Sequence, residues 1–181
     1  MLYSELQCSE AIHKAVERMG FAEMTEIQEK TIPVMLAGHD VIAKAPTGTG
    51  KTCAFGIPVA EHIDPEKKYP QAVIMAPTRE LAQQIAEELT ELTYFMPEVQ
   101  VACVYGGANM EKQARRLAEG CQIVVATPGR LMDHYKHHSI DLAHVTQVVL
   151  DEADEMLNMG FYKDVRHIIE LMKARKSLSM F

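Results

Sequence analysis

Short apolar segments alternate with helical patterns along most of this sequence, and no other feature constrains the fold as strongly. The apolar segments are rich in β-branched residues and are bounded by turn signals; they cover residues 41–43, 72–75, 99–104, 123–125 and 148–150. A last strand is expected to begin at 177–181. Runs of this length and composition predict strands buried on both faces, as in a parallel sheet. The sequence therefore predicts an α/β fold with a mostly parallel central sheet flanked by helices on both faces. Such sheets bind ligands at the carboxyl ends of their strands.

The segments between the predicted strands carry helix signals. Thr78 is a candidate N-cap for a helix whose apolar residues recur at spacings of three and four, namely Leu81, Ile85, Leu89 and Leu92. Thr127 is a second candidate N-cap, because a proline follows it at the first helical position. A further helix is expected over about 162–174.

Composition narrows the class of protein. The chain has 181 residues, 48% of them apolar, which suits one globular domain and excludes a disordered segment. No apolar run approaches the roughly 18 residues of a membrane span, and no signal peptide is recognisable, so no membrane partner is expected. The net charge of −7 excludes binding to polyanions through bulk positive charge. Four cysteines without a C-x-x-C pair favour a reduced, cytoplasmic protein.

A glycine-rich loop after the first predicted strand carries the strongest functional signal. Its residues are Ala45, Pro46, Thr47, Gly48, Thr49, Gly50, Lys51 and Thr52. Small residues let successive backbone N–H groups converge on phosphate oxygens, and the helix that starts near Gly50 adds the positive end of its dipole. Lys51 is expected to bind the β- and γ-phosphates, and the Thr52 hydroxyl to bind Mg²⁺. The alternative is a glycine-rich turn with an incidental lysine.

An acidic segment, Asp151-Glu152-Ala153-Asp154, follows the predicted strand at 148–150. A carboxylate at the end of a buried strand places Asp151 where it can hold Mg²⁺, and Glu152 can then orient and deprotonate the attacking water. Alone, these residues equally fit the acidic first turn of a helix. Together with the glycine-rich loop they predict magnesium-dependent hydrolysis of a nucleoside triphosphate.

The two motifs resemble those of the DEAD-box RNA helicases, and nearly the whole chain is similar to the first RecA-like domain of that family. The family's loop is Ala-x-Thr-Gly-x-Gly-Lys-Thr, so Ala45 is the expected residue where other phosphate-binding loops have glycine. The resemblance implies a RecA-like P-loop NTPase domain with ATP and Mg²⁺ as cofactors. It also implies that Lys51, Asp151 and Glu152 are catalytic, that Thr52 and Asp151 bind the metal, and that Asp154 couples hydrolysis to RNA binding.

An N-terminal segment resembles the adenine-reading Q motif of the family. The resemblance implies that the Gln28 amide recognises the adenine edge and that Phe21 stacks on the base, which favours ATP over GTP. Tyr3 stands where the family more often has phenylalanine, and Met24 and Glu26 replace two prolines that the family often has. Two ordinary amphipathic helices would explain this segment, except for Gln28.

Three further motifs of the family follow predicted strands. They comprise Pro77, Thr78, Arg79 and Glu80; Gly106 and Gly107; and Thr127, Pro128, Gly129 and Arg130. Each combines a strand end or a helix N-terminus with free backbone N–H groups, and the two arginines add local positive charge. By resemblance these residues bind the sugar-phosphate backbone of single-stranded RNA, largely independently of sequence. Each motif alone would be explained as a helix cap and a loop.

The resemblance also divides the chain, into a Q-motif helical region at 1–33 and a RecA-like ATPase domain at 34–181. The family's Ser-Ala-Thr motif is expected directly after Phe181, so we expect the chain to stop before that motif and to lack the second RecA-like domain. In the family that domain supplies arginines that neutralise charge on the transferred phosphoryl group. We therefore expect a monomer that binds nucleotide weakly and does not unwind RNA by itself.

Two other functions stay open at this point. A self-sufficient P-loop NTPase, such as a small kinase or a GTPase, would share the loop, although neither a guanine-binding Asn-Lys-x-Asp or Thr-Lys-x-Asp motif nor a lid-like arginine segment is present. A regulatory or RNA-binding module could use the fold without turnover. The presence of Lys51, Asp151 and Glu152 argues against this second alternative.

Some conspicuous residues receive structural interpretations. His134, His137 and His138 have helical spacing but no acidic or cysteine partner at matching spacing, so a solvated helix end is expected in preference to a metal site. Cys53 is expected to be a packed thiol behind the glycine-rich loop. Met156, Leu157 and Met159 are expected to pack in the core.

Overall fold

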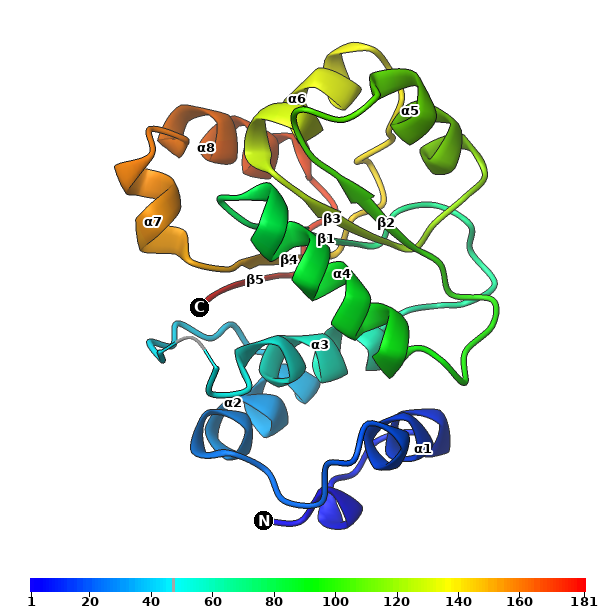
Figure 1. Cartoon of the computed structure of the whole chain (residues 1–181), viewed down its shortest axis with the longest axis vertical. Coiled ribbons are helices and arrows are strands. Elements are labelled where there is room, and N and C mark those ends of the chain that lie inside the picture. Colours follow the sequence, from blue (N-terminus) through cyan, green and yellow to red (C-terminus); the bar gives the residue numbers. More distant parts are fainter. Residues whose placement is uncertain (47) are drawn as a thin grey trace.

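A five-stranded parallel sheet forms the centre of the molecule (Figure 1). The structure is a computed structural model and describes residues 1–46 and 48–181, so Thr47 lies outside the described residues. The strands are arranged in the order β2-β3-β1-β4-β5. Their bounds are β1 Ala72–Met75, β2 Val101–Val104, β3 Ile123–Ala126, β4 Gln147–Leu150 and β5 Ser177–Met180. All four pairings are parallel, which confirms the predicted sheet.

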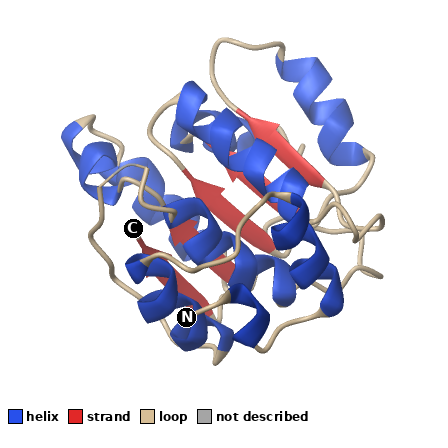
Figure 2. Cartoon of the chain, turned by 60° about the horizontal axis from the view of Figure 1, so that its bottom comes forward, coloured by secondary structure: helices blue, strands red, loops and turns tan. Residues whose placement is uncertain are grey.

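Helices cover both faces of the sheet, as the sequence predicts (Figure 2). The helices are α1 Glu10–Arg18, α2 Glu26–Leu36, α3 Lys51–Glu61, α4 Arg79–Leu92, α5 Met110–Ala118, α6 Pro128–Lys136, α7 Ala153–Asn158 and α8 Tyr162–Leu171, with a short 3₁₀ helix, η1, at Tyr3–Glu5. None of the helices formed by the described residues is long and apolar enough to cross a membrane.

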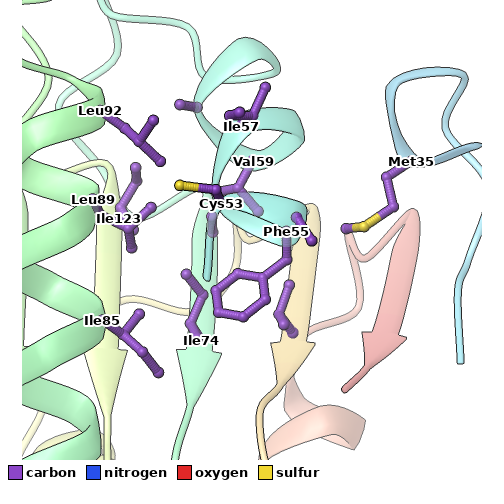
Figure 3. Packing of buried hydrophobic residues seen from close by; sticks show 14 of the residues in the cluster. Met35, Cys53, Phe55, Ile57, Val59, Ile74, Ile85, Leu89, Leu92 and Ile123 are labelled. Atoms are coloured by element: carbon purple, nitrogen blue, oxygen red, sulfur yellow. The ribbon is translucent and has the colours of Figure 1, made fainter. Parts of the chain in front are cut away.

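Alternate residues of each strand enter separate hydrophobic cores, because successive strand side chains point to opposite faces. Ile74 of β1 joins the core formed with α1 to α4, whereas Val73 and Met75 join the core formed with α5, α6 and α8. Figure 3 shows the first core, where α4 faces α3 and the sheet through Ile85, Leu89 and Leu92. The thiol of Cys53 lies in this core, as predicted, and burial raises its pKa to about 12.

The N-terminal helices pack beside α3, on one side of the sheet (Figure 1). Ile12 and Val16 of α1 are buried, and Thr25 is the N-cap residue of α2. The backbone N–H of Tyr3 donates to the carbonyl of Ala22, which ties the start of the chain to the segment before α2.

Residues 41–43 do not form the buried strand that the sequence predicts. Ile42 makes only an isolated parallel bridge to Met180 of β5, although Ala43 N–H donates to the Met180 carbonyl and Met180 N–H to the Val41 carbonyl. Val41 and Ala43 pack against the first core, but Ile42 is 83% exposed. The segment runs along the outer side of β5, where the described residues cover only one of its faces.

The helix after the acidic segment also buries less than predicted. In α7, Met156 is 3% exposed, as predicted, but Leu157 is 56% exposed, and Met159, the C-cap residue, is 47% exposed. The helix has six residues, so it turns only one narrow side toward the core. The prediction that all three side chains pack in the core was therefore wrong for Leu157 and Met159.

Candidate functional site

The glycine-rich loop leads into the N-terminus of α3, where Lys51 is the first helical residue. Gly50 is the N-cap residue and has a φ of 85°, and Gly48 has a φ of 86°, a region that favours glycine. A Cβ atom at Gly50 would collide with the side-chain amide of Gln28. Gly50 therefore serves both the turn and a close contact with α2.

Lys51 lies between the two carboxylates of the acidic segment. Its Nζ is 2.5 Å from Oε1 of Glu152 and 3.5 Å from Oδ1 of Asp151. Burial by itself lowers the pKa of Lys51, but the hydrogen bond to Glu152 and the two negative charges raise it overall. The structure thus brings together the three residues predicted to be catalytic, although Lys51 and Glu152 are 101 residues apart in the sequence.

Asp151 is held at the carboxyl end of β4 and is only 2% exposed. Its backbone N–H donates to the carbonyl of Met75, and its Oδ1 accepts from the N–H of Glu152. Burial raises the pKa of the Asp151 carboxyl, and the positive charge of Lys51 opposes that shift. Asp151 is therefore a fixed, desolvated carboxylate that gains from any further cation.

Glu152 adopts a left-handed backbone conformation, with a φ of 54°, and is the N-cap residue of α7. This region costs a residue with a side chain about 1–2 kcal/mol, and such residues cluster at functional sites. The turn carries the chain away from the sheet immediately after Asp151. It leaves Glu152 half-buried beside Lys51, while Asp154 is exposed on the first turn of α7.

Two hollows flank the loop. One, of about 470 Å³, lies between the loop and the acidic segment and is lined by Ala45, Pro46, Lys51, Glu152 and Asp154 among others. The other, of about 390 Å³, lies between the loop and the start of α2 and is lined by Thr25, Ile27, Lys30, Ala45 and Thr49 among others. The loop thus has space on both sides for the two ends of an elongated ligand.

Thr52 follows Lys51 in the first turn of α3. Burial raises the pKa of Glu88 of α4, and the Thr52 side chain opposes that rise. No cluster of three or more His, Cys, Asp or Glu side chains suited to a metal occurs in residues 1–46 and 48–181. A metal at this site would therefore need oxygen ligands from another molecule besides Asp151 and Thr52.

Gln28 lies at the centre of the N-terminal segment and is 4% exposed. Its Nε2 donates to the carbonyl of Gly50 at 3.2 Å, and its Oε1 accepts from Thr25 N–H at 2.9 Å and from the Tyr3 hydroxyl. Both lone pairs of the amide oxygen are thus occupied. Phe21 is stacked with the Tyr3 ring and remains 44% exposed.

The three remaining motifs lie together at the carboxyl ends of the strands. Thr78 caps α4 by accepting from Leu81 N–H, and Thr127 is the N-cap residue of α6. Nη1 of Arg79 lies 3.9 Å from the position that a Cβ atom would take at Gly107. Arg130 donates to the carbonyl of Ala108 at 2.9 Å. Exposure differs among the motif residues. Pro77, Thr127 and Pro128 are buried, Thr78 and Gly129 are half-buried, and Glu80, Gly106 and Gly107 are exposed.

The structure adds residues to this surface that sequence reasoning missed. The ring of Tyr105 lies under Arg79, with the guanidinium carbon 4.8 Å from the ring centre, and Gln83 donates to the Tyr105 hydroxyl. Gln113 of α5 contacts both Tyr105 and Arg130. The one available signal was position, since Tyr105 directly precedes the glycine pair.

His134 corrects one sequence interpretation. It is fully buried and its Nε2 lies 3.0 Å from Oε1 of Gln113, so it does not belong to a solvated helix end. His137 and His138 are exposed, as expected. Helical spacing alone did not show that α6 turns His134 inward while the helix ends two residues later.

Comparison with known proteins gives one family. A family model described as DEAD/DEAH box helicase matches residues 25–181. The ATP-dependent RNA helicase CshA of Listeria monocytogenes is 51% identical over 179 residues, which is 99% of this chain and 34% of the relative. The ATP-dependent RNA helicase DeaD of Escherichia coli is 44% identical, over 99% of this chain and 28% of the relative. The chain thus spans about a third of the length of the curated relatives it matches.

Solved structures agree with these matches. A DEAD box protein from the hyperthermophile Methanococcus jannaschii superposes with a TM-score of 0.91 at 39% identity, covering 99% of this chain and 49% of that one. A hypothetical ATP-dependent RNA helicase from Sulfolobus tokodaii superposes with a TM-score of 0.86 at 40% identity, covering 96% of this chain and 50% of that one.

Proposed function

Because the chain belongs to the DEAD/DEAH box helicase family, we propose that it is the N-terminal ATPase region of an ATP-dependent RNA helicase. In this proposal it binds ATP with Mg²⁺ and the backbone of single-stranded RNA. In the complete enzyme, ATP hydrolysis is coupled to local unwinding of an RNA duplex. The observation that carries the proposal is the cluster of Lys51, Asp151 and Glu152 at the N-terminus of α3.

The loop and α3 fit a triphosphate. The N-terminus of α3 presents backbone N–H groups and a positive dipole end, and Lys51 adds a full charge at the same place. In the structure that charge is balanced by Glu152, so phosphate oxygens would take the place of Glu152 at Lys51 Nζ. The exchange would release the Glu152 carboxylate from Lys51, and that carboxylate could then orient a water molecule and accept its proton.

The donor set also fits Mg²⁺, a hard cation that prefers oxygen ligands and retains several waters. Asp151 supplies a buried carboxylate whose pKa is raised by burial, so a cation there is favourable. Thr52, next to Lys51 at the start of α3, would supply a hydroxyl. Held by Asp151 and Thr52, Mg²⁺ would supply positive charge to neutralise the negative charge that develops during phosphoryl transfer.

The hollow of about 390 Å³ beside the start of α2 fits the nucleoside end of ATP. The Gln28 amide can donate and accept, which suits the adenine edge, and its oxygen would accept from adenine in place of one of its partners in the structure. Phe21 has an exposed ring that can stack on a base. Gln28 already contacts Gly50 of the loop, so adenine recognition and phosphate binding would be mechanically linked.

RNA would bind along the edge formed by the strand ends. Arg79 and Arg130 supply the positive charge, and the exposed glycine pair and the helix N-termini at Thr78 and Thr127 supply backbone N–H groups. Asp154 is exposed and lines the hollow of about 470 Å³ between the loop and the acidic segment, which suits its predicted role in coupling hydrolysis to RNA binding. Contacts of this kind read the backbone and not the base sequence.

The domain organisation belongs to the same proposal. Residues 1–33 form the Q-motif helical region and residues 34–181 the RecA-like ATPase domain, and a second RecA-like domain completes the site in the whole enzyme. The coverage of about a third of the curated relatives leaves room for such a domain. We propose that the 181 residues alone bind nucleotide weakly, remain monomeric and do not unwind RNA. A cytoplasmic location is part of the proposal.

The test compares the 181-residue chain with the parent protein that includes the second domain. ATP and GTP binding are titrated for the wild type and for Gln28→Ala, and RNA-stimulated turnover is measured for the wild type and for Glu152→Gln. The proposal expects preference for ATP that Gln28→Ala weakens, and turnover that requires both the second domain and Glu152. Equal binding of GTP would favour another P-loop NTPase, and absent turnover in the complete protein would favour a binding module.

A further inference from the structure

A buried polar cluster lies beneath the RNA-binding edge, and no motif accounts for it. At its centre is Gln113 of α5, which is 8% exposed. Its Nε2 donates to the carbonyl of Tyr105 at 3.1 Å, and its Oε1 accepts from Nη1 of Arg130 at 3.1 Å. Nε2 of His134 lies 3.0 Å from the same oxygen. One amide thus connects the loop after β2 with two residues of α6.

The chemistry of these partners fixes the direction of every hydrogen bond. A backbone carbonyl only accepts and a guanidinium only donates, so the amide of Gln113 has one possible orientation. Its oxygen therefore faces both Arg130 and His134. Because an oxygen cannot donate, His134 must carry a proton on Nε2.

The other ring nitrogen of His134 fits this assignment. Nδ1 is buried and has no hydrogen-bond partner within the described residues, so protonating it would bury an unpaired donor and a charge. Burial, and then the positive charge of Arg130, lower the pKa of His134. His134 is therefore neutral, with its proton on Nε2 and directed at Gln113.

The cluster holds Arg130 through Nη1 and leaves its Nη2 able to bind a ligand. Both protons of Nη1 are used, one on the carbonyl of Ala108 at 2.9 Å and one on Gln113. Nε lies 3.8 Å from a carboxylate oxygen of Asp133. Within the described residues Nη2 has no partner, so two N–H groups of a 13% exposed side chain remain for a ligand.

We propose that Gln113 is a positioning residue for RNA binding, which holds the Arg130 guanidinium and the loop of residues 105–108 in one arrangement. The same loop carries the Tyr105 ring under Arg79, so one amide fixes both arginines relative to each other. Holding charged groups in place before binding lowers the entropic cost of binding. This inference rests on the proposed function, because it assigns the edge to RNA.

The test uses Gln113→Met, which keeps the length and volume of the side chain and removes all three hydrogen bonds. Affinity for a fluorescently labelled single-stranded uridine oligonucleotide is measured by anisotropy at low salt, on the 181-residue chain. We expect affinity to fall about fivefold to tenfold, the value of about one net hydrogen bond.

Gln71→Met is the matched control. Gln71 is 6% exposed and also makes three hydrogen bonds, with Asp64 N–H, the Asp64 carbonyl and the Lys67 carbonyl. It lies directly before β1, at the amino ends of the strands, whereas the proposed RNA-binding edge lies at their carboxyl ends. We expect it to lower thermal stability about as much as Gln113→Met and to leave RNA affinity unchanged.

A spectroscopic measurement tests the hydrogen assignment without any variant. The side-chain ¹⁵N–¹H correlation of the wild-type chain should show His134 protonated on Nε2 and not on Nδ1, and Gln113→Met should alter this signal. A proton on Nδ1 in the wild type would overturn the inference, even if no variant folds.

The outcomes distinguish an error in the assignment of the RNA-binding edge from an error in the role of Gln113. If the wild type does not bind RNA, or Arg130→Ala binds as well as the wild type, the RNA edge is wrongly assigned and the inference falls with it. If Arg130→Ala loses RNA affinity while Gln113→Met keeps it, the RNA edge stands and the inference is overturned. Equal loss of affinity in Gln71→Met would also overturn it, since general destabilisation would then explain the effect.

Discussion

The proposed nucleotide site and the proposed RNA-binding edge hold their cations in opposite ways. Lys51 is paired with carboxylates of its own chain, at 2.5 Å from Glu152 and 3.5 Å from Asp151. Arg130 is held mainly by neutral acceptors, the Ala108 carbonyl and the Gln113 amide. A cation that is already paired must exchange partners to bind an anion, whereas a cation held by neutral groups keeps its charge available. We therefore expect partner exchange at the nucleotide site and prearranged contacts at the RNA-binding edge.

The largest effect is expected from Glu152→Gln in the complete enzyme. Loss of the general base should lower ATP turnover by a factor of about 10²–10⁴. ATP affinity should rise at the same time, because Lys51 loses its charged competitor. Turnover assays and nucleotide titrations measure the two quantities. Glu155→Gln, an exposed acidic residue on the same helix, should change neither. Weaker ATP binding by Glu152→Gln would contradict partner exchange.

Arg130→Ala tests the expected prearranged contacts at the RNA-binding edge. RNA affinity should fall at least about tenfold, the value of a charge-assisted hydrogen bond, and the salt dependence of binding should become shallower by about one unit of slope. ATP affinity should stay the same. Arg166→Ala, which removes an exposed arginine paired with Glu170 on α8, serves as the control and should leave RNA affinity unchanged. A similar loss in both variants would show that charge anywhere on the surface is sufficient.

Gly50→Ala sharpens the description of the nucleotide site. With a φ of 85° and the Gln28 amide in the space that a Cβ atom needs, the variant should lose about 1–2 kcal/mol of unfolding free energy. Chemical denaturation measures the loss. Gly129→Ala has open space around its Cβ and a backbone conformation that suits alanine, so its stability should be unchanged or slightly higher. Equal stability of the two variants would show that Gln28 does not approach the loop.

The smallest effect is expected from Tyr3→Phe. Losing the buried hydrogen bond to Gln28 should lower the free energy of unfolding by about 0.5–1.5 kcal/mol. ATP affinity should rise, since one lone pair of the Gln28 oxygen becomes available to adenine. Calorimetry and nucleotide titration test the two effects. Tyr94→Phe, in which the ring is 56% exposed, should be neutral in both. Lower ATP affinity in Tyr3→Phe would show that the hydroxyl assists Gln28.

Much of the fold was predictable because its signals are local. The strands at 72–75 and 123–125 were predicted almost to the residue, since buried parallel strands are short continuous apolar runs. The cap at Thr78 was also predictable from its neighbours. The prediction failed at Ile42, because burial depends on what lies across the sheet, and its segment lies at the edge.

The sequence by itself determined most of the elements, the sheet type and the chemical groups expected at the site, because periodicity and motif spacing act over a few residues. Only the tertiary structure decided which groups face each other. Lys51 meets Glu152 101 residues away, and Gln113 meets Arg130 17 residues away and His134 21 residues away. Parallel strands need crossover connections, and these bring the ends of distant segments to one edge of the sheet. Contacts made there leave no periodic trace in the sequence, so the partners of Gln28, Lys51 and Arg130 became known only from the fold.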